Sequence, residues 1–258
     1  MKTFCFTVDD NIRFLKESTE NHSRDLFDHP YMAMYKRLHD ELGLKVQLNL
    51  FYEMPNFNLS MVPAWWKDQW AANADWLKLS FHSRLENERP YEFSAYDEVY
   101  ADCKAVQDEI LRFAGAASLA KTTTVHFCVA TEEGVRALAD QSVKGLLGLY
   151  GTAEAPRMSY TLTAEEGTAV RNGAIVCKDG MAHAGINMVI NLFEKEEALS
   201  RIVPYLQRDT VFVMIHEQYF YADYVAYQSD FEKKLRALFL VLHKSGHRSA
   251  FFEDCLTK

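Results

Sequence analysis

The sequence of 258 residues lacks the features of several large functional classes. It contains no uninterrupted apolar run of about eighteen residues, so no transmembrane helix is expected. Its 28 basic residues against 36 acidic ones give a net charge of −8, which argues against nucleic acid or a membrane surface as a partner. Neither a Gly-x-Gly-x-x-Gly pattern nor a P-loop is present, which argues against a dinucleotide-binding or nucleotide-binding domain.

The cysteines and the first residues predict a cytoplasmic location. The cysteines are odd in number, scattered and without a CxxC pair, which predicts buried thiols in a reducing compartment. The first apolar run is too short for a secretory signal, and Asp9 and Asp10 interrupt it. No pattern indicates an oligomeric state. The five cysteines are Cys5, Cys103, Cys128, Cys177 and Cys255.

What the sequence does contain is an alternation of short β-rich runs with amphipathic helical stretches. Several of the runs are almost continuously apolar, which is typical of parallel strands covered on both faces. The predicted strands are Thr3–Val8, Lys45–Phe51, Leu77–Phe81, Thr122–Phe127, Gly145–Tyr150 and Val211–Ile215, with weaker candidates at Ala174–Cys177, Met188–Phe193 and Ala250–Phe252. A helix is predicted from the apolar stripe Val99, Cys103, Val106, Ile110 and Phe113, a second after the candidate N-cap Thr131, and a third over Phe231–Lys244.

This alternation predicts an α/β fold, with a barrel favoured over a doubly wound sheet. In parallel α/β folds the active site lies where the strands end and the βα loops begin. Polar residues stand at several predicted strand ends: Asp9-Asp10, Glu53, His82-Ser83, His126 and His216-Glu217-Gln218. These positions are therefore the candidates for chemistry.

Two of the strand ends offer metal-binding side chains. Of the adjacent carboxylates Asp9 and Asp10, one could bind a metal ion while the other acts as a base. A simple turn is an equally good interpretation of the pair. His82 and Glu86 are four residues apart and share a face if the loop enters a helical turn. Asp10, His82 and Glu86 would then be three ligands with an open position for water, suited to Mn²⁺, Fe²⁺, Mg²⁺ or Zn²⁺. Otherwise Glu86 is a solvated charge in the polar run Arg84–Arg89.

His216 follows an apolar strand and is well placed to protonate a leaving group. Glu217 and Asp223 are candidates to orient its ring. A purely structural role is the alternative for a histidine at a strand end.

The order of these motifs resembles that of the NodB-type polysaccharide deacetylases, carbohydrate esterase family four. Thr7-Val8-Asp9-Asp10 resembles the family's Thr-Phe-Asp-Asp motif, and Leu79–Glu86 is similar to the strand carrying its His-Ser/Thr-x-x-His motif. Val213–Glu217 is similar to the late apolar strand that ends in a catalytic histidine. The three motifs span nearly the whole chain, and most of their specificity lies in their order and strand-end placement.

The resemblance implies an irregular (β/α) barrel of about seven parallel strands, formed by residues 1–258 as a single domain. It implies that Asp9 is the general base and His216 the general acid. Asp10 and His82 would be ligands of a divalent metal ion, with Glu86 in place of the family's second histidine. The reaction implied is metal-assisted hydrolysis of an N-acetyl or O-acetyl group on a sugar.

The sequence also departs from the family pattern. Asn11 stands where a glycine usually follows the paired aspartates. No Arg-Pro-Pro-Tyr motif follows the fourth strand, where Thr124-Val125-His126-Phe127 is found instead, and His126 is a candidate for the place of the missing arginine. The usual acidic residue and tryptophan before the last histidine are absent, and Asn187 and Asn191 lie in that stretch.

Together these residues predict a metal-dependent deacetylase-like hydrolase of a small or soluble carbohydrate. The alternative is a non-catalytic barrel that binds a carbohydrate or a protein partner. A hydrolase of another carbon–nitrogen bond, such as a cyclic amide, is a third interpretation, but the His-x-His pair frequent in such sites is absent. The predicted substrate-binding residues are His126, Glu217, Gln218 and Tyr219, the last of which begins a tyrosine-rich loop.

Overall fold

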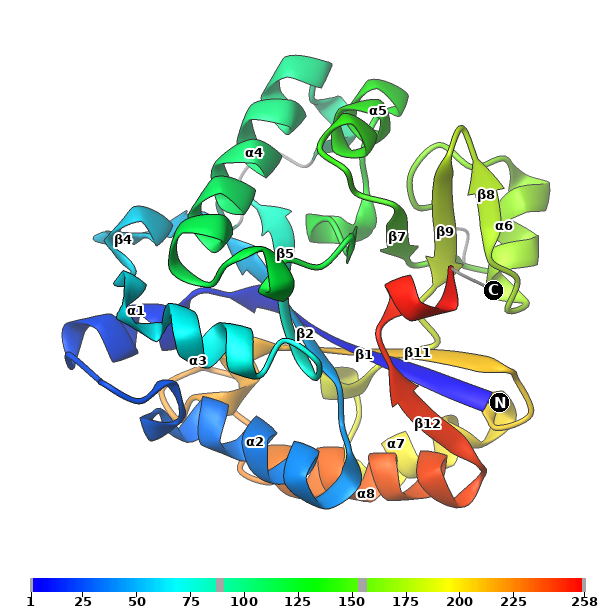
Figure 1. Cartoon of the computed structure of the whole chain (residues 1–258). Coiled ribbons are helices and arrows are strands. Elements are labelled where there is room, and N and C mark those ends of the chain that lie inside the picture. Colours follow the sequence, from blue (N-terminus) through cyan, green and yellow to red (C-terminus); the bar gives the residue numbers. More distant parts are fainter. Residues whose placement is uncertain (1, 87–90, 153–156, 257–258) are drawn as a thin grey trace.

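The computed structural model describes residues 2–86, 91–152 and 157–256. Strands form the centre of the molecule and helices pack around them (Figure 1). In this described part of the chain, no helix combines the length and the apolar character needed to cross a bilayer.

The first sheet consists of six strands, all of whose pairs are parallel. They are β1 (Lys2–Asn11), β2 (Val46–Phe51), β5 (Leu77–Ser83), β10 (Met188–Val189), β11 (Thr210–His216) and β12 (His247–Ala250). The order is β10-β11-β1-β2-β5, with β12 paired to β1. One edge of β1 therefore has two neighbours, because its first residues pair with β12 and its last residues pair with β2.

The second sheet has the order β6-β7-β9-β8, in which only β8 is antiparallel to its neighbour. A separate antiparallel hairpin, β3 with β4, follows β2. The bounds are β3 (Glu53–Met54), β4 (Phe57–Asn58), β6 (Thr122–Thr123), β7 (Gly145–Gly148), β8 (Val176–Lys178) and β9 (Met181–Gly185).

The two sheets meet at two seams. At the first, the Ser80 hydroxyl on β5 donates a hydrogen bond of 2.8 Å to the Thr122 carbonyl on β6. At the second, the chain passes directly from β9 to β10, and the Asn187 N–H donates to the Phe212 carbonyl on β11 at 2.8 Å. The strands thus enclose an irregular (β/α) barrel, which confirms the predicted fold class.

Helices cover the outside of the barrel (Figure 1). The apolar stripe predicted for the longest helix is buried in α4, and Thr131 caps α5 by accepting a hydrogen bond of 2.9 Å from the Gly134 N–H. The bounds are α1 (Arg13–Glu20), α2 (Pro30–Leu42), α3 (Lys67–Ala72), α4 (Tyr96–Phe113), α5 (Glu132–Asp140), α6 (Ala164–Arg171), α7 (Lys195–Arg201) and α8 (Phe231–Lys244).

Helices on one face and the barrel interior on the other bury β1 on both sides. Phe4, Phe6 and Val8 belong to the main apolar core, whereas Cys5 packs in a smaller apolar cluster that also contains Met214. A strand buried on both faces reads as a continuous apolar run, which is why this strand was predictable. Polar side chains at its C-terminal end are therefore costly to bury, unless they form hydrogen bonds or bind a ligand.

Three sequence-based expectations are corrected by the structure. The strand expected over Thr122–Phe127 ends at Thr123, because the chain then turns into a short 3-10 helix, η6 (His126–Cys128). The sequence patterns miss β9, whose residues Met-Ala-His-Ala-Gly lack the β-branched and aromatic side chains typical of strands. Cys177 is exposed rather than buried.

Candidate functional site

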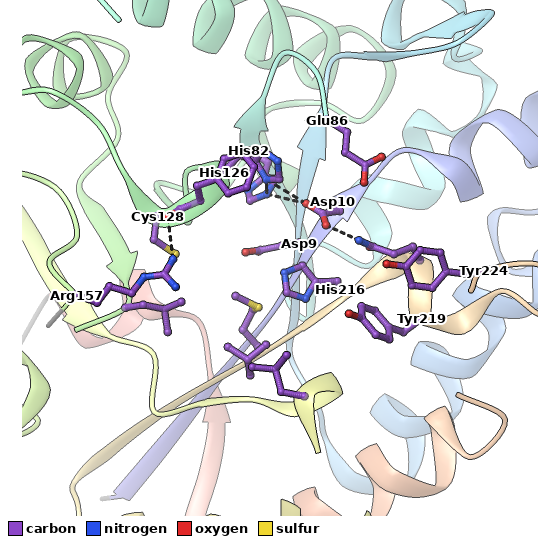
Figure 2. Close-up of a pocket in the computed structure, with 16 residues that line it drawn as sticks. Asp9, Asp10, His82, Glu86, His126, Cys128, Arg157, His216, Tyr219 and Tyr224 are labelled. Atoms are coloured by element: carbon purple, nitrogen blue, oxygen red, sulfur yellow. Dashed lines mark hydrogen bonds and ion pairs between the residues drawn. The ribbon is translucent and has the colours of Figure 1, made fainter. Parts of the chain in front are cut away.

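A cavity of about 370 Å³ opens at the C-terminal ends of β1, β5 and β11 (Figure 2). Residues from both ends of the chain meet there, because β1 and β11 are neighbours and β5 lies two strands from β1. The cavity brings together all but one of the predicted site residues: Asp9, Asp10, His82, Glu86, His126, His216, Gln218 and Tyr219 line it. Glu217 does not line it.

The end of β1 is shaped by a bulge. The pairing of β1 with β2 shifts between Val8 and Asn11, and Asp10 has a left-handed backbone with φ of 63°. The Asn11 amide donates hydrogen bonds to the Val8 carbonyl at 2.6 Å and the Asn49 carbonyl at 3.2 Å. Asn11 thus stabilises the bulge through its side chain, and the bulge lets Asp9 and Asp10 both line the cavity.

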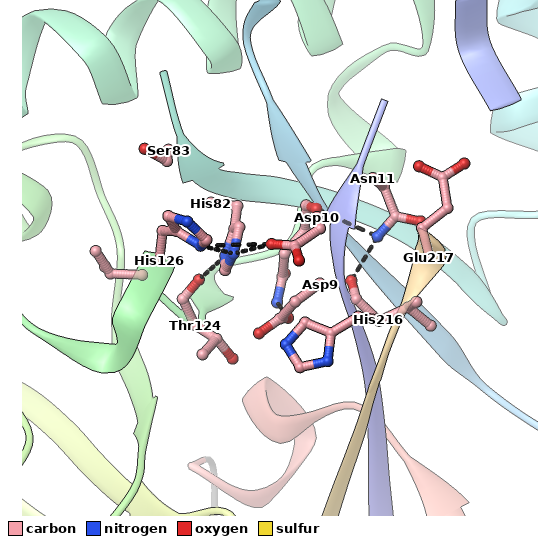
Figure 3. A network of polar contacts seen from close by, with 12 residues as sticks. Asp9, Asp10, Asn11, His82, Ser83, Thr124, His126, His216 and Glu217 are labelled. Atoms are coloured by element: carbon pink, nitrogen blue, oxygen red, sulfur yellow. Dashed lines mark hydrogen bonds and ion pairs between the residues drawn. The ribbon is translucent and has the colours of Figure 1, made fainter. Parts of the chain in front are cut away.

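Asp10, His82 and His126 form a compact group of ligand-type atoms (Figure 3). Asp10 Oδ1 lies 3.0 Å from His82 Nε2 and 3.4 Å from His126 Nδ1, and the two imidazole nitrogens are 3.1 Å apart. Atoms that bind one ion at about 2.1 Å lie about 3.0 Å apart at right angles and about 3.4 Å apart at the tetrahedral angle. The triangle therefore has the dimensions of three ligands on one face of a metal ion.

Neighbouring groups hold these three side chains in place. His82 Nδ1 lies 2.5 Å from the Thr124 carbonyl and must donate to it, so Nε2 donates to Asp10 when the ring is protonated and keeps a lone pair for a cation when the ring is neutral. Gln218 Nε2 donates to Asp10 Oδ2 at 2.7 Å and leaves Oδ1 facing the histidines. Supporting hydrogen bonds of this kind accompany metal-binding histidines and carboxylates, so the residues fit a divalent cation.

The turn that delivers His126 is strained. Phe127 and Cys128, the two residues after it, have φ of 61° and 59°, a conformation that is costly for side chains other than glycine or asparagine. Together with Asp10, they are three left-handed residues lining one cavity. Strain of about 1–3 kcal/mol per residue is kept only where the surrounding structure enforces it, and it collects at functional sites.

The two aspartates differ in their electrostatic surroundings. Burial raises the pKa of Asp9, which is 1% exposed and accepts a hydrogen bond of 2.7 Å from the Asn49 amide. Burial would also raise the pKa of Asp10, but the hydrogen bonds to His126 and His82 outweigh it and hold the pKa of Asp10 well below its usual range. Asp10 is therefore the ionised member of the group, and Asp9 has more basic character.

The two histidines of the group are also shifted in opposite directions. Burial lowers the pKa of His126, and its hydrogen bond to Asp10 does not compensate. For His82, the charges of Asp9 and Asp10 outweigh burial and raise the pKa.

His216 is paired with Asp9 in the sheet register, and its ring is held by an asparagine. Its Nδ1 lies 2.8 Å from Asn191 Oδ1, so Nδ1 carries the hydrogen and Nε2 is the nitrogen left for proton transfer. The prediction that Glu217 or Asp223 orients this ring is wrong. Asp223 instead forms an exposed ion pair with Arg13, and the Glu217 carboxylate binds the N-terminus of α1.

Glu86 lines the cavity but lies outside the three-residue group. The helical turn assumed for His82 and Glu86 is not formed, because His82 lies within β5 and residues 84–86 are bends. Residues 87–89 of the predicted polar run lie outside the described residues. A ligand role for Glu86 stays a prediction.

Three further residues at the site escape the motif search. Asn49 and Asn191 hold Asp9 and His216, and Arg157 lines the cavity on the far side from Glu86 (Figure 2). Asn49 could have been found from the sequence, because an amide side chain inside an apolar strand requires a hydrogen-bond partner. Asn191 and Arg157 stand in no recognisable pattern.

No protein-family model matches this chain, and no curated protein matches its sequence. Solved structures do match it along 99–100% of its length. A family 4 acetyl xylan esterase from Clostridium thermocellum, solved with a cobalt ion, has 13% identity and a TM-score of 0.54, and the match covers 91% of that protein. The chain has the fold of the NodB-type polysaccharide deacetylases.

Two other matches show how widely this fold is used. A family 4 pseudoenzyme from Bacillus anthracis has 11% identity and a TM-score of 0.56, and the chain spans 65% of its length. A 4-alpha-glucanotransferase from Thermococcus litoralis has 13% identity and a TM-score of 0.64, with 41% of its length covered. Because the fold occurs in proteins with different activities, the reaction must be argued from the site.

Proposed function

We propose that this protein is a metal-dependent hydrolase that removes an acetyl group from an N- or O-acetylated soluble carbohydrate. The observation that carries the proposal is the triangle of Asp10, His82 and His126 beside a buried carboxylate, Asp9, and a strand-end histidine, His216. Glycosyl transfer by a pair of carboxylates does not require such a ligand group, so deacetylation is favoured over the glucanotransferase reaction.

Asp10, His82 and His126 would hold the divalent ion. Two imidazoles and one carboxylate form a set that suits Zn²⁺ or Fe²⁺ better than Mg²⁺, and they leave positions open for water and substrate. When bound, such an ion polarises the acyl carbonyl and lowers the pKa of water.

The other two residues would move protons. Asp9, fixed by Asn49, takes the proton of the attacking water, and its raised pKa brings it closer to neutrality, where a general base works best. His216 gives a proton from Nε2 to the departing amine or alkoxide, while its Nδ1–H stays bonded to Asn191. Both roles require contact with the substrate or its attacking water, and both side chains line the same cavity.

The cavity volume of about 370 Å³ fits a small sugar. Tyr219 and Tyr224 line the same cavity and offer aromatic faces on which a sugar ring can pack (Figure 2). Gln218 keeps one buried amide oxygen without a partner among the described residues, and this atom can accept a hydrogen bond from a hydroxyl or an N–H group.

The test is acetate release from a panel of N- and O-acetylated sugars, with metal-free protein and with protein reloaded with zinc or iron. We expect release only from the loaded protein, and a loss of at least about 10²-fold in Asp9→Asn. Asp40→Asn, an exposed carboxylate on α2, is the matched control and keeps full activity. Equal release by Asp9→Asn and the wild type would refute the proposed base.

A second candidate is a barrel that binds a sugar without turning it over. It is favoured by the finding that Asp9 and His216 each form a hydrogen bond with a neutral amide, Asn49 and Asn191. In that case no acetylated sugar releases acetate, while calorimetry detects sugar binding of equal strength in the wild type and Asp9→Asn.

A further inference from the structure

Three consecutive residues at the end of β11, residues 216 to 218, each contact the end of β1 or the start of α1. His216 pairs with Asp9 in the sheet register, and Gln218 donates a hydrogen bond to Asp10. Between them, Glu217 turns away from the cavity and is 1% exposed. A buried carboxylate beside the two proposed proton-transfer groups, but not in their cavity, needs an explanation of its own.

The Glu217 carboxylate accepts four hydrogen bonds, and in Figure 3 it points away from the His216 ring. Oε2 accepts from the backbone N–H groups of Ile12 at 2.7 Å and Arg13 at 3.0 Å. Oε1 accepts from the Phe14 N–H at 2.7 Å and the Tyr221 hydroxyl at 2.7 Å. Every lone-pair direction of the carboxylate is thus used, and three of the four donors belong to one stretch of backbone.

That stretch is the start of α1, which has no cap of its own. The N-cap residue, Ile12, has a side chain that cannot accept a hydrogen bond. A residue 203 to 205 positions later therefore takes the place of the missing N-cap. Since Ile12 comes two residues after Asp10, the cap also holds the end of β1 that carries both aspartates.

We propose that Glu217 is a positioning residue that sets the distance between His216 and the bulged end of β1, which carries Asp9 and Asp10. Its carboxylate is a rigid cross-link between the two strand ends, because it is attached next to His216 and bound next to Asp10. The proposal rests on the proposed function, since its effect is measured on the metal group that contains Asp10. If Glu217 only stabilised α1, its substitution would leave the zinc affinity of that group unchanged.

The test compares two Glu→Gln substitutions that both affect α1. In Glu217→Gln the side-chain amide presents N–H hydrogens to backbone N–H groups, so half of the cross-link becomes repulsive. Glu17→Gln, within α1, removes the ion pair of Glu17 with Arg13 and changes its hydrogen bond with His29, and no hydrogen bond joins Glu17 to the end of β1 among the described residues. Burial raises the pKa of the Glu217 carboxyl to about 7, so measurements at about pH 8 keep the wild-type carboxylate ionised.

Zinc is titrated into each metal-free protein by calorimetry. We expect zinc to bind about 10- to 100-fold more weakly to Glu217→Gln, as for other residues that orient a metal ligand, and unchanged binding to Glu17→Gln. Equal zinc affinity of folded Glu217→Gln and wild type overturns the proposal, and so does an equal loss in both variants. Tyr221→Phe removes only one of the four hydrogen bonds and serves if Glu217→Gln does not fold, with a smaller loss in the same direction expected.

A second measurement separates this proposal from the proposed function. If the wild type binds no zinc, the proposed function fails, and the cross-link is then tested by amide hydrogen exchange of residues 12–14. Faster exchange at these amides in Glu217→Gln than in Glu17→Gln supports the cross-link. Equal exchange in the two variants overturns it.

Discussion

Replacing His126 by alanine removes one corner of the ligand triangle and leaves Glu86 in place. The triangle predicts that metal affinity then falls by more than the 10- to 100-fold typical of residues that only support a ligand. Glu86→Gln, in contrast, is expected to change the affinity little, because Glu86 lies outside the triangle. The two variants therefore distinguish the candidate ligand group found in the structure from the one predicted by sequence spacing.

The size of the effect can be stated for thermal unfolding. A metal ion at about 100 times its dissociation constant stabilises the fold by about 2.7 kcal/mol. For a chain of this size each kcal/mol raises Tm by about 2–4 °C, so the wild type should gain about 5–11 °C. In His126→Ala a 100-fold weaker site leaves about 0.4 kcal/mol at the same metal concentration, or about 1 °C.

The assay is differential scanning fluorimetry of metal-free protein with added zinc. His22→Ala is the matched control, because His22 is exposed and lies on a turn outside the cavity. If Glu86→Gln loses the thermal shift and His126→Ala keeps it, the reasoning from the triangle is refuted and the spacing argument for Glu86 is restored.

Three further predictions follow from single contacts. His216→Ala should lower acetate release by about 10²- to 10⁴-fold and leave zinc affinity within a factor of about three; a matching loss of zinc binding would contradict its role as an acid. Asn191→Asp places a negative charge at Nδ1 of His216, which favours the protonated ring, so the alkaline limb of the rate profile should move to higher pH; a limb that stays in place would contradict this. Thr131→Ala removes the cap of α5 and should cost about 1 kcal/mol in urea unfolding; a change below about 0.3 kcal/mol would show that the cap is unimportant.

The residues at strand ends could be predicted because burial makes polar side chains conspicuous. Asp9, Asp10 and His216 follow strands buried on both faces, where a charge or an imidazole needs a purpose. The ladder between β1 and β11 then brings them together without any further information.

His126, the third side chain of the candidate metal group, could be predicted as a site residue but not as a possible ligand. His126 follows a strand of only two residues and is delivered by a turn with two left-handed residues, Phe127 and Cys128. Neither residue is a type that favours such a backbone, so local propensity points away from the turn. The sequence-based reasoning instead chose Glu86 by a helical spacing, but the backbone at residues 84–86 is not helical.

β1 pairs with β11 along one edge and with β12 along the other, and both partners come late in the chain. This has a consequence for how the protein folds. The ladders of β1 with β11 and β12 join residues more than 200 positions apart, such as Thr3 with Thr210 and Lys2 with His247. Contacts of such long range are formed late and slow the search for the native state. During synthesis, an almost wholly apolar first strand must therefore wait for the last part of the barrel to emerge, and we expect this interval to be the one in which chaperones matter most.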